Sequence, residues 1–153
     1  MDKKIIGIAI DRAKETMNKN MGGPFGAAVI KDGEVVAVSS NTVLSDHDPI
    51  AHAEVNAIRE AGRVLGTHDL SGCEIYATGY PCPMCMSAII WANIGKVHYS
   101  NTLAEAEEIG FRDDKIYNWL KTHDTAILDI TRLESDKAKE LYEEYSKKGR
   151  EIY

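Results

Sequence analysis

Residues 74–100 read EIYATGYPCPMCMSAIIWANIGKVHYS, and this stretch decides how the chain is expected to fold. The apolar and β-branched residues of its first part predict a short buried strand over residues 74–78, and a second strand is predicted over residues 96–100. Between them, Pro83 stands where proline is favoured, at the start of a helix over residues 83–91. Alternating strands and helices predict an α/β protein in which helices cover both faces of a sheet.

The remaining elements follow from hydrophobic spacing and turn signals. Apolar residues at helical intervals predict a first helix over residues 3–20. Two apolar runs, joined by an Asp-Gly turn at residues 32–33, predict a β-hairpin. Asp48 as N-cap and Pro49 at the first helical position predict a helix over residues 49–64. Beyond the quoted stretch, we expect helices over residues 103–109, 115–120 and 133–147 and a strand over residues 126–130.

Length and charge limit the class of protein. A chain of 153 residues is expected to form one domain, residues 1–153, that buries roughly 68–70% of the surface of the unfolded chain. Its 18 Lys and Arg against 24 Asp and Glu give a net charge of −6. No nucleic-acid partner is therefore expected, because neutralising phosphates needs clustered basic residues. The apolar run at residues 5–10 is too short for a signal peptide or a membrane span, so no membrane partner is expected.

The three cysteines indicate a reducing compartment. An odd number, with Cys82 and Cys85 separated by two residues, is typical of a metal or redox pair and not of a disulfide framework. Cys73 is expected to be a small core residue. These features predict a cytoplasmic protein.

Two predicted helix starts carry reactive side chains, His52-Ala53-Glu54 in one and Cys82 and Cys85 in the other. A helix N-terminus lowers the pKa of a cysteine and so favours the thiolate that binds zinc. Two thiolates and one imidazole make three protein ligands, which leaves a fourth zinc position open for water, as in catalytic sites. Glu54 is expected to reach that water.

Each part of this pattern has a simpler interpretation. A Cys-x-x-Cys pair alone can be a redox pair or half of a structural zinc site, and a lone histidine at a helix start is more often a cap or a solvated side chain. The combination is more specific. The chain carries His-x-Glu and then, 30 residues after His52, Pro-Cys-x-x-Cys.

That combination is the signature of the zinc-dependent nucleobase deaminases, and the chain resembles the cytidine deaminase superfamily. Within the superfamily it is most similar to bacterial guanine deaminases, through residues 23–27 (Gly-Pro-Phe-Gly-Ala), Asn41, residues 51–54, residues 81–85 and Gly110-Phe111 followed by acidic residues. The resemblance implies a three-layer α/β/α fold with a central mixed five-stranded sheet. It also implies one Zn²⁺ per chain and hydrolytic deamination of a free nucleobase, guanine to xanthine plus ammonia.

The resemblance further implies roles for individual residues. His52, Cys82 and Cys85 would hold the metal, Glu54 would move protons, and Asp113 would support substrate binding or proton transfer. Substrate contacts would come from the walls Phe25 and Trp91, from Asn41, from the backbone N–H of Ala53 and from Tyr153. The implied partners are a small nucleobase and a second copy of the chain, with residues 131–153 forming a C-terminal helix and arm that is exchanged between subunits.

Two departures from the guanine deaminase pattern bear on the substrate. Arg112 separates Gly110-Phe111 from the two aspartates, and Tyr80 precedes Pro81 where relatives often carry glutamate. The alternatives are therefore a tRNA-specific adenosine deaminase, or a deaminase of another small amine such as cytosine, guanosine or isoguanine. A non-catalytic zinc-stabilised interaction module is the alternative from a different class.

Overall fold

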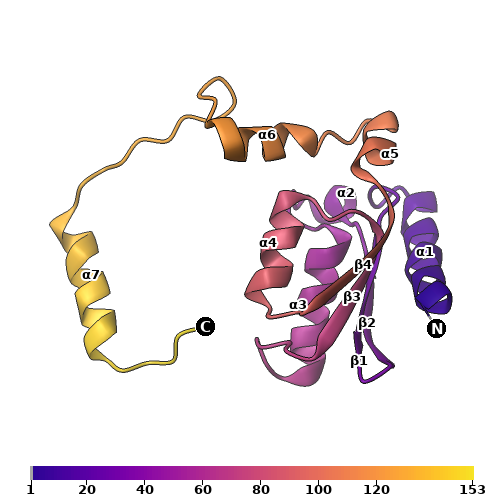
Figure 1. The fold of residues 1–153 in the computed structure, drawn as a ribbon, viewed down its shortest axis with the longest axis horizontal. Coiled ribbons are helices and arrows are strands. Elements are labelled where there is room, and N and C mark those ends of the chain that lie inside the picture. The colour runs from indigo at the N-terminus through magenta and orange to yellow at the C-terminus, as the bar shows by residue number, and fades with distance from the viewer. Residues whose placement is uncertain (1) are drawn as a thin grey trace.

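A computed structural model describes residues 2–153, and its centre is a mixed sheet of four strands (Figure 1). The strands lie in the order β2–β1–β3–β4, and their bounds are β1 Gly26–Lys31, β2 Glu34–Ser40, β3 Cys73–Gly79 and β4 Lys96–Asn101. β1 pairs antiparallel with both β2 and β3, whereas β3 and β4 are parallel. The mixed α/β fold is as predicted.

The β1–β2 hairpin is confirmed. Asp32 and Gly33 connect its strands, and both have positive φ, 51° and 82°. A two-residue turn with positive φ at both positions matches the right-handed twist of the strands, and Asp-Gly is one of the pairs that favour it.

Helices cover both faces of the sheet, which gives three layers (Figure 1). Helix α1, Asp2–Asn18, packs on one face, where Ile5 and Ala9 join Ala28 and Tyr76 in a buried cluster. On the other face, α3 (Ala53–Leu65) and α4 (Pro83–Trp91) enclose the larger part of the core. Because α4 connects parallel strands β3 and β4, its N-terminus lies at the carboxyl end of β3.

The predicted start of the helix at residues 49–64 is wrong. The structure has a short helix α2, Val43–Asp46, and α3 begins only at Ala53, with His52 as its N-cap. Asp48 instead forms a turn, because its carboxylate accepts the backbone N–H of Ile50 at 2.9 Å. This local hydrogen bond competes with helix formation.

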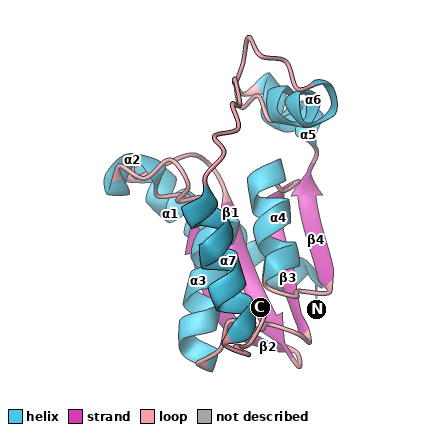
Figure 2. Ribbon diagram, turned by 90° about the vertical axis from the view of Figure 1, so that its left-hand side faces the viewer, coloured by secondary structure: helices cyan, strands magenta, loops and turns pink. Residues whose placement is uncertain are grey.

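The residues after β4 form three more helices, α5 (Leu103–Glu108), α6 (Asp114–Thr122) and α7 (Asp136–Lys147). Helices α5 and α6 lie beyond the carboxyl end of β4 (Figure 2), whereas α7 stands apart from the sheet (Figure 1). The predicted strand over residues 126–130 is wrong, so the sheet has four strands and not five. Residues 125–127 form a turn instead, because Asp124 accepts the backbone N–H groups of Ala126, Ile127 and Leu128.

Among residues 2–153, no helix has the length and apolar character needed to cross a bilayer.

Candidate zinc centre and pocket

The ends of two helices bring His52, Cys82 and Cys85 together. Their ligand atoms all lie within 4.8 Å of one another, and His52 Nδ1 is 3.6 Å from Cys82 Sγ and 3.5 Å from Cys85 Sγ. In a tetrahedral zinc site, with Zn–S of about 2.3 Å and Zn–N of about 2.0–2.1 Å, the N···S edge is roughly 3.6 Å. Donor types and spacing therefore both fit a single zinc ion.

Local helix geometry explains the position of the sulfurs. Cys82 is the N-cap of α4, and its Sγ accepts the backbone N–H of Cys85 at 3.5 Å. Pro83 follows at the first helical position, where the missing N–H removes no helical hydrogen bond. Contact with Cys85, then with His52, lowers the pKa of Cys82 to about 4, against desolvation by burial. Cys82 is thus prepared to bind a metal as thiolate.

Glu54 lies in the first turn of α3 and is buried, with 7% of its surface exposed. The Cys85 thiol donates to Glu54 Oε2 at 3.5 Å, so the carboxyl group borders the metal ligands. Burial raises the pKa of Glu54 above its ordinary value. A carboxyl group with a raised pKa beside a metal centre is suited to accept and return a proton.

A cavity opens directly onto these groups. It contains six of the residues predicted from sequence together with two that were not assigned a role, Tyr80 and Phe111. The lining residues are Phe25, Asn41, His52, Glu54, Tyr80, Cys82, Phe111 and Asp113.

Asn41 presents a donor to this cavity. Its Oδ1 accepts the backbone N–H groups of Gly23 and Val43, both at 3.2 Å. The side-chain oxygen is therefore occupied, and the Nδ2 amide remains to donate a hydrogen bond. A ligand that contacts Asn41 must offer an acceptor.

Two aromatic rings form an apolar wall. Phe25 and Phe111 meet edge to face, with ring centroids 4.8 Å apart. Gly23 makes room for them, because a Cβ at this position would lie 2.9 Å from the Phe111 ring. The sequence signal for Phe111 was the Gly110-Phe111 pair, whereas the signal for Tyr80 was only its position before the cysteine pair.

The two neighbouring aspartates have different surroundings. Asp113 lines the cavity, and burial raises its pKa, with Cys82 adding to the effect. Asp114 is exposed and pairs with Arg112 at 3.1 Å. The aspartate available to a ligand in the pocket is Asp113.

Three predicted substrate residues do not line the cavity. Trp91, predicted as a wall, ends α4 at the opposite end from the cysteines and is 70% exposed. Tyr153 is 79% exposed, and its ring lies 6.0 Å from that of His68. Ala53 is fully buried at the start of α3, between the metal ligand His52 and Glu54.

Comparison with known proteins agrees with this site. Residues 1–101 match the family model of the cytidine and deoxycytidylate deaminase zinc-binding region. Guanine deaminase of Bacillus subtilis is 47% identical over 109 residues, which are 71% of this chain and 70% of the relative. The tRNA-specific adenosine deaminase of Aquifex aeolicus is 43% identical over 93 residues, 61% of each chain.

Similarity extends to the whole fold. The X-ray structure of guanine deaminase from Bacillus subtilis superposes with a TM-score of 0.91 and 34% identity, covering 99% of this chain and 97% of that chain. The family match, the imidazole and two sulfurs at zinc-site spacing and the buried carboxyl group lead to one conclusion. The chain belongs to the cytidine and deoxycytidylate deaminase family and carries the zinc-binding region of that family.

Proposed function

We propose that this protein catalyses the zinc-dependent hydrolytic deamination of a free nucleobase, converting guanine to xanthine and ammonia. The observation that carries the proposal is one cavity lined by two of the three zinc-type ligands, by the buried carboxyl group of Glu54 and by aromatic rings. Similarity to guanine deaminase, at 47% identity and over 99% of the chain in structure, supports guanine as the substrate.

His52, Cys82 and Cys85 would hold the metal. Zn²⁺ bound there supplies the Lewis acidity that makes a water molecule nucleophilic at neutral pH. Glu54 takes one proton of the attacking water and delivers it to the ring nitrogen next to the reacting carbon. It then takes the proton of the new C–OH group and passes it to the amine, which departs as ammonia. Its burial beside the ligands excludes bulk water from these proton transfers.

The other cavity residues orient the base. Phe25 and Phe111 provide faces against which a planar ring packs, as nucleobase sites require. The Asn41 amide donates to an acceptor on the base, and guanine offers O6 and N7. We assign Asp113 to substrate contact or proton transfer, because it lines the same cavity as His52 and Cys82 and its raised pKa favours proton exchange.

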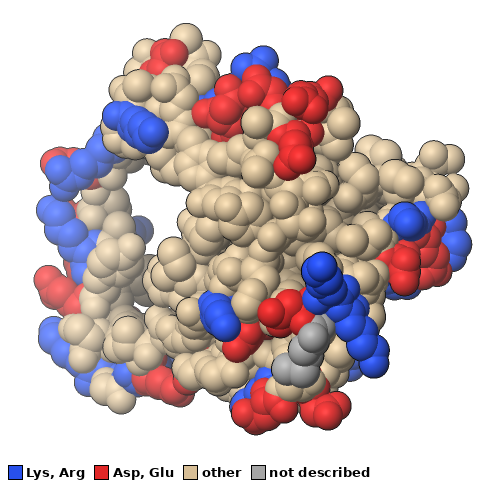
Figure 3. Space-filling model, turned by 45° about the vertical axis from the view of Figure 1, so that its right-hand side comes forward, with Lys and Arg blue, Asp and Glu red and all other residues tan. Residues whose placement is uncertain are grey.

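Surface charge favours a free base over tRNA. The net charge is −6, and acidic side chains gather at the top of the molecule in Figure 3, where Lys and Arg are scattered among Asp and Glu. A tRNA substrate needs a continuous basic surface. The similarity to a tRNA-specific adenosine deaminase extends over 61% of the chain and makes that activity the second candidate.

We further propose that residues 131–153 of one subunit pack on a second copy in a homodimer. Helix α7 exposes Leu141 and Tyr142 and stands away from its own sheet (Figure 1). An amphipathic helix normally buries such an apolar face. Tyr153 would then enter the partner's site. We place this dimer in the cytoplasm, because unpaired cysteine ligands persist in a reducing compartment.

A substrate panel tests the proposed activity. The zinc-loaded protein is incubated with guanine, cytosine, isoguanine, guanosine and a tRNA anticodon stem-loop, and ammonia and product are measured. Guanine should be converted fastest, and Glu54→Ala should bind zinc without turnover. Faster inosine formation in the stem-loop would reassign the protein to tRNA. Zinc binding without any turnover would assign a zinc-stabilised interaction module.

A mixing experiment tests the exchanged arm. A variant lacking Tyr153 and the Glu54→Ala variant are each inactive if Tyr153 serves the partner's site. Unfolding and refolding them together should restore part of the activity, because a hybrid dimer contains one complete site. A mixture that stays inactive, with a monomer in sedimentation, contradicts the exchange.

A further inference from the structure

We infer that Tyr117 is a positioning residue that fastens the start of α6, and with it Asp113, to the loop before α4, which carries the zinc-type ligand Cys82. The inference rests on the proposed function only in giving Asp113 a role in turnover. The contact between Tyr117 and the loop is a feature of the fold itself.

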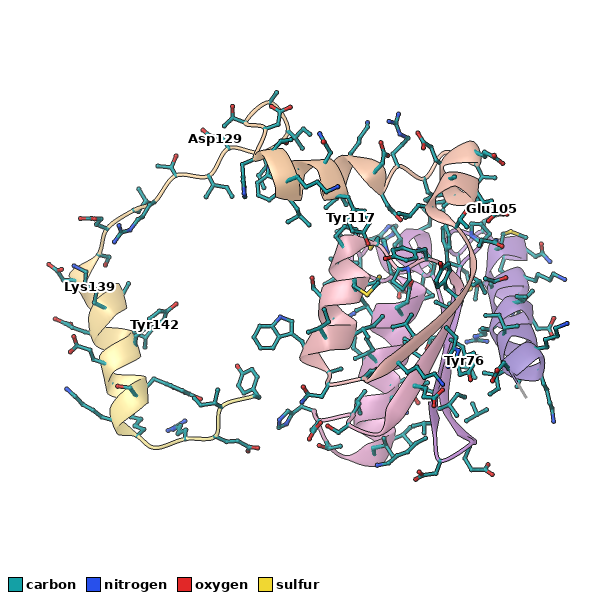
Figure 4. The ribbon with its side chains drawn as sticks, in the orientation of Figure 1. Tyr76, Glu105, Tyr117, Asp129, Lys139 and Tyr142 are labelled. Atoms are coloured by element: carbon teal, nitrogen blue, oxygen red, sulfur yellow. The ribbon has the colours of Figure 1, made fainter. Side chains whose placement is uncertain are left out.

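The central contact is a hydrogen bond between two distant parts of the chain. Tyr117 Oη donates to the backbone carbonyl of Pro81 at 3.0 Å, and Pro81 directly precedes the ligand Cys82. Figure 4 shows Tyr117 between α6 and the N-terminal end of α4. Burial, together with the nearby Tyr80, raises the pKa of Tyr117 to about 12. The hydroxyl is therefore protonated, and able to donate, at every pH at which the enzyme would work.

The same contact sets the position of Asp113. The backbone N–H of Tyr117 donates to the Asp113 carbonyl at 3.2 Å, so the two residues are one helical turn apart. Asp113 is the N-cap residue of α6, but its side chain makes no capping hydrogen bond to the helix. The carboxyl group is free for the cavity, and the helix behind it is held by Tyr117.

Few other contacts hold α6 in place. Of its residues, Tyr117 and Trp119 alone are partly buried, and the rest are exposed. The hydrogen bond of Trp119 lies away from Pro81, because its indole N–H donates to the Leu128 carbonyl at 3.4 Å, within the C-terminal part of the chain. The contact at the loop is extended by Tyr80, whose ring lies 6.5 Å from that of Tyr117 and lines the cavity.

A tyrosine elsewhere in the fold provides a matched control. Tyr76 Oη donates to Asp2 Oδ1 at 2.9 Å on the face of the sheet that α1 covers. Tyr117→Phe and Tyr76→Phe each remove one hydroxyl and one hydrogen bond between separate elements. Only the Tyr117 hydrogen bond lies next to residues that line the cavity.

The experiment combines kinetics with hydrogen–deuterium exchange. We expect Tyr117→Phe to bind zinc normally, to lose about fivefold in kcat/KM for guanine, as one net hydrogen bond implies, and to exchange amide protons faster over residues 110–122. Tyr76→Phe should leave both readouts unchanged. In an Asp113→Asn background, adding Tyr117→Phe should cause no further loss, because the function of the positioned group is already removed.

Two results overturn the inference. Equal losses in the wild-type and Asp113→Asn backgrounds would mean that Tyr117 acts through general structure and not through Asp113. Unchanged exchange over residues 110–122 would mean that the hydroxyl does not hold α6. If the wild-type protein deaminates no guanine, the proposed function fails separately, and the exchange experiment still decides whether Tyr117 fastens α6 to the loop.

Discussion

Residues 2–101, here called the body, differ sharply from residues 102–153, the C-terminal segment. The body contains the whole sheet and all buried residues of the described chain except Ala106. The C-terminal segment consists of three helices and connecting loops that are largely exposed. The body therefore has its own hydrophobic core, whereas the segment buries almost no side chains and has no core of its own.

The functional groups are divided unequally between the two regions. The body holds all three zinc-type ligands and Glu54, and the family model matches this region. The segment contributes Phe111 and Asp113 to the cavity. The body thus carries the zinc-type ligand set, and the largely exposed segment completes the lining of the cavity.

The largest expected effect is the loss of turnover when Glu54, the buried carboxyl group of the body, is replaced. Glu54→Gln should retain zinc and lose roughly 10²–10⁴-fold in kcat, as removal of a general acid/base typically does. Steady-state kinetics and metal analysis measure both quantities. Glu34→Gln, on an exposed position at the start of β2, is the control and should match the wild type. Near-normal turnover by Glu54→Gln would place proton transfer elsewhere.

The next largest effect is on the free energy of unfolding, which should respond differently to side-chain truncation in the two regions. Ile75 is fully buried in β3, so Ile75→Ala should lower the free energy of unfolding by about 2–5 kcal/mol. Leu141 is 63% exposed on α7, and Leu141→Ala in an isolated subunit should change it by at most about 0.5 kcal/mol. Urea unfolding measures both. In the proposed homodimer the loss for Leu141→Ala should be larger and depend on protein concentration, and a small loss at every concentration would contradict the packing of α7 on a second copy.

A smaller effect tests how closely the layers of the body approach. A Cβ at Gly26 would lie 2.0 Å from the Ala9 carbonyl oxygen, so Gly26→Ala must displace α1 from β1 and should cost about 1–3 kcal/mol. Gly7, in the same helix, has no atom within 4 Å of its Cβ position. Gly7→Ala should stabilise by about 0.5–1 kcal/mol, because glycine is unfavourable inside a helix. Thermal unfolding measures the stability of both variants. A change in the same direction for both would contradict this packing.

The sequence predicted the body better than the segment for a physical reason. Local patterns determined the hairpin at Asp32-Gly33 and the helix at Pro83, and the structure has both. The apolar residues 126–130 were interpreted as a strand, but a strand needs a neighbour that supplies hydrogen bonds, and the Asp124 turn takes its place. Pattern alone does not reveal whether such a neighbour exists.

The site shows the same limit. The zinc-type ligands were predictable because fixed spacings place them at helix starts, whereas the start of α3 was missed because Asp48 forms a turn with Ile50. The resemblance placed Trp91 in the pocket as a wall, yet Trp91 lies at the far end of α4 and does not line the cavity. Tyr80 was noticed only as a departure, since its cavity contact depends on the tertiary fold.

The smallest expected effect concerns Tyr76, whose hydroxyl ties β3 to the N-terminus of α1. At neutral pH, Tyr76→Phe should lower the free energy of unfolding by about 1 kcal/mol, the typical net value of a hydrogen bond. Burial, with the Asp2 contact next, raises the pKa of Tyr76 from 10.0 to about 12. Between these two values the unfolded chain loses the tyrosine proton while the folded chain keeps it, so wild-type stability falls as pH rises. The phenylalanine variant has no such proton to lose, and the gap between the two proteins should narrow from pH 10 to pH 12. Urea unfolding at closely spaced pH values measures this difference in the free energy of unfolding. A difference that stays constant from pH 10 to pH 12 would mean that Tyr76 has the same pKa in the folded and unfolded chains.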